Sequence, residues 1–304
     1  MNKNVLFEYD VFELSKGKYH FNINGVSYIG NPLSNTAMYV SKKVEKLLVN
    51  LKDKEHCLIF SEENIDIPED LLKNNLFIKT STPQKDYALF VEKMSDKIEK
   101  KNVERKFSLT KAGYYIGENV EIGVNSYIEP GVVIGHDVVI GDSAFIKAGA
   151  VLKNCKIGDN FIAGENSTIG SYGFTMADDD NGNKMRIPTL GNVRIGNHVE
   201  IGALANVSRG SAGDTRIDDY VKIDSFVHIG HDAHLHKNVE LPAGAIIGGF
   251  VEMKEGSYAG INSSLRNRIT IGENALIGMG AVVTKSVETN LTVVGNPAKP
   301  LIKK

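Results

Sequence analysis

Apolar residues recur at every sixth position over much of the chain. Between residues 217 and 283 each sixth residue is apolar. A period of six fits neither the 3.6-residue repeat of a helix nor the two-residue alternation of a hairpin strand. It is typical of a solenoid in which each hexad supplies one short strand and one turn, so that three hexads close a triangular coil. The residues of this run, which we expect to point inward, are Ile217, Ile223, Ile229, Leu235, Leu241, Ile247, Met253, Ala259, Leu265, Ile271, Ile277 and Val283.

An earlier run of the same period predicts that the solenoid begins near residue 113. After Leu152 the pattern reaches Ile157 one residue early, which we interpret as a tightened corner. The rhythm stops at 170–194 and again at 208–216. Segments that break the period must leave the stack as loops, and such loops often carry function. The residues of this earlier run are Ile116, Ile122, Ile128, Ile134, Ile140, Ile146, Leu152, Ile157, Ala163 and Ile169.

The first part of the chain has a different pattern, which predicts a small α/β domain at residues 1–112. Short apolar runs favour strands, and apolar residues at helical spacing favour helices. The solenoid is then expected at 113–292 and a C-terminal tail at 293–304. The predicted strands are Val26–Ile29, Cys57–Phe60 and Phe77–Lys79, and the predicted helices are Ser41–Leu51 and Tyr87–Lys100.

Composition narrows the possible partners and compartments. A net charge of -2 argues against nucleic acid as a partner, because phosphate binding needs a concentrated positive face. The cysteines Cys57 and Cys155 form no disulfide framework, which favours a reducing compartment. The sequence has no bilayer-spanning apolar stretch and no signal-peptide core, so we expect a cytoplasmic protein without a membrane partner.

The densest group of titratable side chains lies inside the unbroken repeat, at His228, His231, Asp232, His234 and His236. Residues on neighbouring coils are eighteen apart, so Gly249 is expected to lie directly above His231. An imidazole with an ordinary pKa of about 6.5 can accept a proton near neutrality. The repeat register therefore favours His231 as a general base beside a stretch of bare backbone. For the other histidines, the simpler interpretation is that they lie on the outer surface of the solenoid and have no catalytic role.

The stretch from Ile169 to Gly249 resembles the UDP-3-O-acylglucosamine N-acyltransferases of lipid A synthesis. The resemblance implies that His231 is the catalytic base. Two departures are Ser208, where the family has Asp, and Arg268, at the place of a second functional histidine. The matching residues are Ile169-Gly170-Ser171-Tyr172-Gly173-Phe174, the loop 178–183, Arg186-Ile187-Pro188, Gly191, Val193, Val199-Glu200-Ile201-Gly202-Ala203, Arg209-Gly210, Asp214-Thr215, Ile223-Asp224 and His231.

The end of the chain resembles a second group, the hexapeptide acyltransferases that use coenzyme A and act on nucleotide-linked amino sugars. The matching segments are Gly280–Lys285 and Val294–Pro300. Together the two resemblances imply a left-handed parallel β-helix, a homotrimer, and active sites between neighbouring subunits. They also imply that the pantetheine arm of coenzyme A lies along the coils, at Gly249, Ile261, Met279 and Gly280.

The resemblance further implies substrate-binding positions in both parts of the chain. Tyr28-Ile29-Gly30-Asn31-Pro32 is similar to a uridine-binding segment of the lipid A enzyme, so Tyr28 and Asn31 are candidates there. A base could stack on Tyr28 or Tyr39, although both could equally be ordinary core or surface residues. In the solenoid the candidates are Phe174, Arg209 and Asp224.

We therefore expect an N-acyltransferase that moves an acyl group from acyl-CoA to the amine of a nucleotide-linked amino sugar. No permanently bound cofactor and no metal is expected. The acidic residues that could orient His231 are Asp214, ranked first because it ends the second insertion, Asp232 and Asp224. A main-chain N–H, such as that of Gly249, could stabilise the oxyanion.

Three alternatives remain open. The first is the lipid A enzyme itself, with an acyl carrier protein as donor. The second is a zinc-dependent β-helix carbonic anhydrase, suggested by the spacing from His231 to His236, although no third ligand is evident at a matching height. The third is a non-catalytic scaffold, which would be indifferent to coenzyme A and nucleotide sugars.

Overall fold

The computed structural model describes residues 7–301, which form two compact units. The first unit comprises the residues up to Glu104 together with Phe174–Leu190 and Ser211–Gly213. The second comprises Arg105–Gly173, Gly191–Gly210 and the residues from Asp214 onward. The observed division thus differs from the predicted boundary at residue 113, and it assigns parts of both predicted loops to the first unit.

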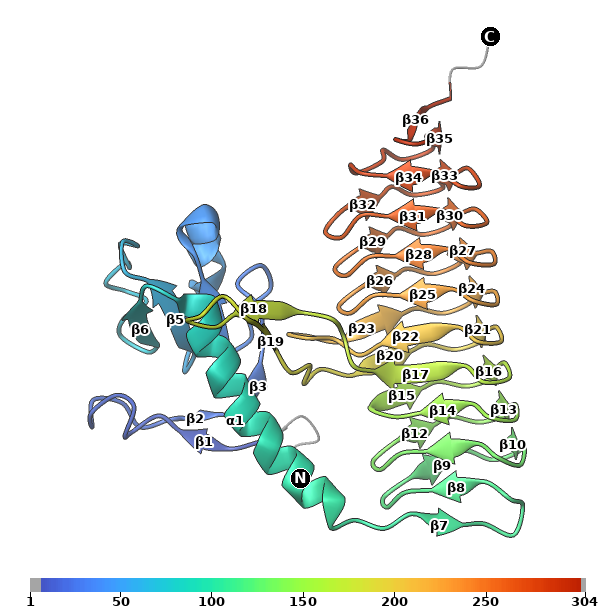
Figure 1. The fold of residues 1–304 in the computed structure, drawn as a ribbon, viewed down its shortest axis with the longest axis horizontal. Coiled ribbons are helices and arrows are strands. Elements are labelled where there is room, and N and C mark those ends of the chain that lie inside the picture. The colour runs from blue at the N-terminus through green and yellow to red at the C-terminus, as the bar shows by residue number, and fades with distance from the viewer. Residues whose placement is uncertain (1–6, 302–304) are drawn as a thin grey trace. The chain divides into compact units, whose positions relative to one another are not determined.

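The second unit is a solenoid of stacked coils (Figure 1), which confirms the predicted mainly β architecture. Three sheets, here named I, II and III, run the length of the stack. Their strands are parallel except at the two ends, where β7 pairs antiparallel with β8 and β36 pairs antiparallel with β35.

Each sheet takes one strand from each coil, in the following order. Sheet I contains β10 (Tyr127–Ile128), β13 (Phe145–Ile146), β16 (Ile162–Ala163), β21 (Glu200–Ile201), β24 (Lys222–Ile223), β27 (Glu240–Leu241), β30 (Tyr258–Ala259), β33 (Leu276–Ile277), β35 (Thr292–Val294) and β36 (Lys299–Pro300). Sheet II contains β34 (Val282–Val283), β31 (Ser264–Leu265), β28 (Ile246–Ile247), β25 (His228–Ile229), β22 (Asn206–Ser208), β17 (Thr168–Ser171), β14 (Val151–Leu152), β11 (Val133–Ile134), β8 (Tyr115–Ile116) and β7 (Ser108–Leu109). Sheet III contains β32 (Thr270–Ile271), β29 (Glu252–Met253), β26 (His234–Leu235), β23 (Thr215–Ile217), β20 (Val193–Ile195), β15 (Cys155–Ile157), β12 (Val139–Ile140) and β9 (Glu121–Ile122).

The strand register follows the sequence period. Arg216 pairs with His234, and His234 pairs with Glu252, which are spacings of eighteen residues. Phe145 pairs with Ile162, one residue closer in sequence, so the coil that contains Ile157 is shortened as the pattern predicted. Strand β35 crosses the predicted boundary of the C-terminal tail at residue 293 and continues sheet I.

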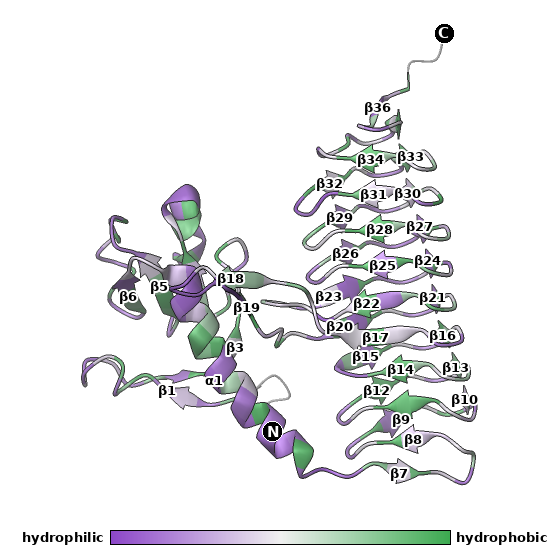
Figure 2. Ribbon diagram, in the orientation of Figure 1, coloured by the Kyte–Doolittle hydropathy of each residue, from purple (hydrophilic) through white to green (hydrophobic). Residues whose placement is uncertain are grey.

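Most hexads beyond the first coils bury two side chains rather than one. Ile229 and Leu235 are fully buried, as the period predicts, but Val227 and Ala233 are buried as well, two positions earlier. Green segments accordingly recur along every coil in Figure 2. The core of the solenoid therefore combines large aliphatic residues on the strands with Val and Ala at the turns, and its burial provides the main stabilisation of the stack.

The first unit is built around a four-stranded parallel sheet of order β3-β4-β5-β6. One face packs against the long helix α1, which shows alternating apolar and polar bands in Figure 2. The other face packs against the 3-10 helix η1. Within residues 7–301 neither helix is long and apolar enough to cross a membrane. The bounds are β1 Tyr9–Asp10, β2 Asn22–Ile23, β3 Gly25–Val26, β4 Thr36–Val40, η1 Lys42–Leu51, β5 Leu58–Glu62, β6 Leu76–Thr80 and α1 Pro83–Val103.

The first predicted loop forms a hairpin in the first unit. Strands β18 (Met176–Asp178) and β19 (Lys184–Arg186) pair antiparallel. The hairpin contributes Ala177, Ile187 and Leu190 to the apolar cluster that contains α1. The Lys85 ammonium also forms a 2.5 Å ion pair with Asp180. The insertion is therefore a packed part of the N-terminal unit rather than a free loop.

Gly170, where the first insertion leaves the stack, should tolerate no side chain. A β-carbon there would lie 1.7 Å from the main-chain oxygen of Lys153, and the residue has a φ of +83°. We expect Gly170→Ala to lower the free energy of unfolding by about 3 kcal/mol or more, because main-chain atoms must shift. Chemical denaturation measures this. Gly182→Ala is the matched control, because Gly182 has a φ of +78° and no atom within 4 Å, and it should cost only about 1 kcal/mol. Equal losses for the two variants would contradict the close approach at Gly170.

Candidate active site on the solenoid

His231 lies at the edge where the coils turn from sheet II to sheet III, between β25 and β26. Its Nδ1 is 2.8 Å from Oδ2 of Asp232, and the two side chains are 15% and 3% exposed. A β-carbon at Gly249, on the next coil, would lie 2.8 Å from Nε2 of His231. The imidazole therefore lies against the backbone of Gly249, as the eighteen-residue stacking predicts.

Neighbouring side chains fix the orientation of the His231 ring. Phe250 meets it edge to face, with ring centroids 5.3 Å apart. The guanidinium of Arg268 lies 4.1 Å from the Phe250 ring, so the residue at the place of the family's second histidine supports this wall of the site. The main-chain N–H of Asp232 donates to the Thr215 hydroxyl at 2.9 Å. The His231–Asp232 pair is thus held from two coils.

His228 lies nearby on sheet II and is half-buried. Its Nδ1 is 3.0 Å from Nδ2 of Asn206 on the adjacent strand. Desolvation lowers the pKa of His228 below its ordinary value, and the proximity of His231 lowers it further. These two effects favour the neutral form of the His228 ring.

Asp214, which the sequence analysis ranked first as the group that orients His231, has other partners. Its carboxylate accepts a 2.9 Å hydrogen bond from the N–H of Asn192 and forms an ion pair with Arg194. The ranking is therefore wrong, and the contact with His231 is made by Asp232. The reason is local. The turn at 208–216 places Asp214 beside Arg194, which lies in β20, the first strand of the stack after the insertion at 170–194. Asp224 is exposed and accepts a hydrogen bond from its neighbour Ser225.

The four residues assigned to the pantetheine arm lie on two different edges of the solenoid. Gly249 is on the edge between sheets II and III, with His231. Ile261, Met279 and Gly280 are on the edge between sheets I and II, where the N–H of Gly280 bonds to the carbonyl of Ile261. Ile261 and Met279 are 47% and 77% exposed. Within one chain, the structure does not bring these three residues together with Gly249.

The remaining candidates are divided between the two units. In the second unit, the Nε of Arg209 donates to the carbonyl of Gly191 at 2.6 Å. In the first unit, Phe174 is highly exposed and lies under the guanidinium of Arg186.

Tyr28 and Asn31 form a tight turn in the first unit, in which the N–H of Asn31 donates to the carbonyl of Tyr28 at 2.9 Å. The Tyr28 ring lies over Gly30, because a β-carbon there would be 2.7 Å from Cε2. Asn31 is exposed and Tyr28 is partly exposed, so neither is a simple core residue.

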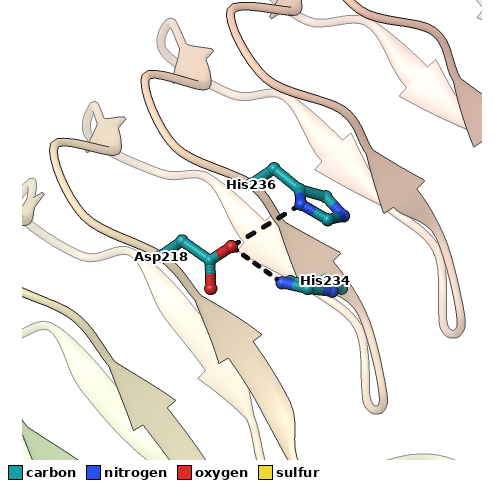
Figure 3. Close-up of side chains that lie close together, drawn as sticks. All are labelled: Asp218, His234 and His236. Carbon is teal, nitrogen blue, oxygen red and sulfur yellow. Dashed lines mark hydrogen bonds and ion pairs between the residues drawn. The ribbon is translucent and has the colours of Figure 1, made fainter.

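A second group of polar side chains lies on the outer surface of the solenoid around β26, and sequence reasoning noted its two histidines but missed Asp218. His234 Nε2 and His236 Nδ1 approach the same carboxylate oxygen of Asp218, at 3.0 Å and 3.6 Å (Figure 3). The sequence analysis found no third ligand at the height of the histidines, and this is wrong, because Asp218 supplies a carboxylate there. The available signal was the spacing, since Asp218 precedes His236 by eighteen residues. Desolvation lowers the pKa of His234, and hydrogen bonding and charge at Asp218 partly oppose this.

Comparisons with known families agree with the repeat. Residues 214–249 match the family described as bacterial transferase hexapeptide (six repeats), and residues 260–288 match the hexapeptide repeat of succinyl-transferase. Residues 110–176 match the GMPPB C-terminal domain. Residues 214–249 and 260–288 therefore consist of hexapeptide repeats, and the second unit is a left-handed parallel β-helix.

The chain is similar in sequence to UDP-3-O-acylglucosamine N-acyltransferases. It is 37% identical over 145 residues to the enzyme of that name from Caulobacter, which is 48% of this chain and 42% of the relative. It is 33% identical over 150 residues, 49% of each chain, to the probable UDP-3-O-acylglucosamine N-acyltransferase 2 of Arabidopsis thaliana. The chain thus spans about half the length of the curated relatives it matches.

Solved structures show the same fold. The UDP-N-acetylglucosamine acyltransferase from Campylobacter jejuni superposes with a TM-score of 0.56 at 23% identity, over 64% of this chain and 74% of that chain. The enzyme from Bacteroides fragilis gives a TM-score of 0.55 at 20% identity, over the same shares of the two chains. At these identities the likeness establishes the architecture.

Proposed function

We propose that this protein is an N-acyltransferase that acylates the free amine of UDP-3-O-acylglucosamine. The observation that carries the proposal is the His231–Asp232 pair, whose ring lies against the bare backbone of Gly249. The sequence relatives named for this reaction support the choice of acceptor over other nucleotide-linked amino sugars.

In the proposed reaction His231 acts as the general base. Asp232 accepts a hydrogen bond from Nδ1–H, which sets the tautomer in which Nε2 is the basic nitrogen that takes a proton. The amine nitrogen attacks the carbonyl carbon of an acyl thioester as Nε2 takes the proton from nitrogen. Collapse of the tetrahedral intermediate breaks the carbon–sulfur bond, and the thiolate leaves with that proton. The products are an amide and a free thiol.

A main-chain donor is available for the oxyanion of this intermediate. Among residues 7–301, the N–H of Gly249 donates no hydrogen bond. Since Gly249 lies against His231 and has no side chain, a carbonyl oxygen can approach this N–H while the base remains in reach. We assign the oxyanion to this position.

The proposed donor is an acyl group on a carrier protein, which is the donor that the resemblance to the lipid A enzyme implies. Acyl-CoA presents the same thioester and pantetheine arm, so His231 and Gly249 would serve both donors. The ending of the chain, at Gly280–Lys285, resembles enzymes that use coenzyme A. The two donors are therefore compared in one assay.

The distribution of candidates over two edges supports a homotrimer. Within one chain, Ile261, Met279 and Gly280 lie on a different edge from His231 and Gly249. A second chain that places its own edge between sheets I and II beside His231 would unite the two groups. A closed cyclic assembly does this for every site. It would also cover the exposed side chains of Ile261 and Met279.

The proposal is tested with the purified chain and UDP-3-O-(3-hydroxyacyl)glucosamine, with 3-hydroxyacyl carrier protein and 3-hydroxyacyl-CoA as separate donors. We expect an N-acylated product by mass spectrometry, faster turnover with the carrier-protein donor, and sedimentation as three chains. UDP-N-acetylglucosamine, whose nitrogen is already acylated, should give no product. A trimer that acylates the amine with neither donor would refute the assigned reaction, and a monomer that is fully active would refute the shared site.

A further inference from the structure

We infer that Asp218, His234 and His236 form a binding site for a divalent transition-metal ion of the zinc class. The site lies on the outer surface of the solenoid around β26 and spans two coils. It is separate from the proposed acyl-transfer site, because His231 is paired with Asp232 and is not part of the group. The inference is therefore independent of the proposed reaction.

The distances from the Asp218 oxygen to the two imidazole nitrogens are close to the spacing that a tetrahedral ion requires. Bonds of about 2.0–2.1 Å from zinc to nitrogen or oxygen place neighbouring ligand atoms roughly 3.3 Å apart. The observed separations from the Asp218 oxygen are 3.0 Å to His234 Nε2 and 3.6 Å to His236 Nδ1. All three atoms lie within 4.8 Å of one another. An ion can thus enter with only small side-chain movements.

The two imidazoles face the same carboxylate (Figure 3). Their rings are stacked, with centroids 3.9 Å apart and planes 26° apart. One residue, Leu235, separates His234 in β26 from His236, which follows the strand, and Asp218 is on the coil before them. The backbone of the β-helix therefore preorganises the group, which reduces the side-chain entropy that metal binding costs.

A supporting shell is also present. The other ring nitrogen of His236, Nε2, is 3.0 Å from Oε1 of Glu252, and Lys254 lies 2.5 Å from the same oxygen. A metal-ligating histidine almost always donates its second N–H to such a carboxylate, which fixes the tautomer and raises the basicity of the ligand. Glu252 thus selects the form of His236 that leaves Nδ1 free for the ion.

The donor set indicates which ion binds. Two imidazoles and one carboxylate suit Zn²⁺ and its neighbours in the transition series, whereas Mg²⁺ and Ca²⁺ prefer oxygen ligands. His234 and His236 are each 27% exposed and Asp218 is 42% exposed, so the ion would be reached from solvent. With three protein ligands, a fourth position remains for water or an external donor.

The test is titration of the untagged, chelator-treated full-length protein with Zn²⁺ alone, followed by calorimetry. We expect one Zn²⁺ per chain and no comparable binding of Mg²⁺. His236→Ala and Asp218→Asn should raise the Kd for Zn²⁺ by about a hundredfold or more. Glu252→Gln, which changes only the supporting shell, should raise it by about tenfold or more.

His198→Asn is the matched control, because His198 lies on the edge between sheets III and I and stacks on Tyr220 rather than on the proposed ligands. It should leave the Kd unchanged. Circular dichroism melting of each variant checks that the β-helix is intact. Binding below one equivalent in the parent protein, or equal affinity in the His236→Ala and His198→Asn variants, would overturn the inference. Either result would leave the acyl-transfer proposal untouched.

Discussion

Replacing His231 by alanine or asparagine should lower the rate of acyl transfer by about a hundredfold or more, because general-base catalysis usually contributes at least that factor. The loss should be in kcat, with the KM for the nucleotide sugar little changed, since the imidazole is assigned to proton transfer and not to holding the nucleotide. Steady-state kinetics with a saturating thioester donor measures both constants. Thermal melting of both variants accompanies the kinetics, because either substitution removes a hydrogen-bond partner from the nearly buried Asp232 carboxylate.

A comparison with His198 makes this result specific. His198→Asn removes an imidazole from another edge, at a residue whose φ of 58° asparagine tolerates. It should retain activity within a fewfold of the parent. If His231→Ala also stays within a fewfold, His231 is not the base and the assigned mechanism fails.

The solenoid was predictable because one short period determines it. Residues such as Ile229 and Leu235 repeat every six positions, and the structure buries them at the same place in each coil. The second buried position, at Val227 and Ala233, was missed because Val, Ala and Ser there are less distinctive than a continuous aliphatic series. The early arrival of Ile157 correctly predicted the shortened coil.

The N-terminal unit was harder to predict, because its elements are short and depend on tertiary contacts. Strand β4, Thr36–Val40, is the best-buried part of the sheet together with β5, yet it was not predicted. Its sequence TAMYV shows neither the alternation of apolar and polar residues that is typical of a strand nor apolar residues at helical spacing. The hairpin at 174–190 was expected as a loop on the solenoid, since only its packing on the α1 cluster shows that it belongs to the first unit.

Within the candidate sites, contacts between residues stacked on neighbouring coils were predictable, whereas contacts that depend on the path of a turn outside the repeat were not. The eighteen-residue spacing placed Gly249 above His231, and the same spacing would have placed Asp218 beside His236. The choice between Asp232 and Asp214 depends on the path of the turn at 208–216, which follows no repeat. That turn directs Asp214 to Arg194 and leaves the adjacent Asp232 to bind His231.

Gly249→Ala should lower acyl transfer by about a hundredfold without unfolding the protein. The new methyl group would lie 2.8 Å from Nε2 and 2.9 Å from Cε1 of His231, well inside ordinary contact distance. The ring must therefore move by more than about half an ångström. Asp232 and Phe250 restrict this movement, so the ring loses either its hydrogen bond or its position. Displacements of about 1 Å in catalytic groups can cost about a hundredfold in rate.

A double-mutant cycle identifies the cause of that loss. If Gly249→Ala acts by displacing the imidazole, it should have little further effect in a His231→Ala background, where no ring remains to be moved. The rates of the parent, the two single variants and the double variant are compared, with thermal melting as the check on folding. Full additivity of the two losses would contradict the contact between Gly249 and His231 as the source of the effect. Non-additivity would show that the absence of a side chain at residue 249 matters because the base occupies that space.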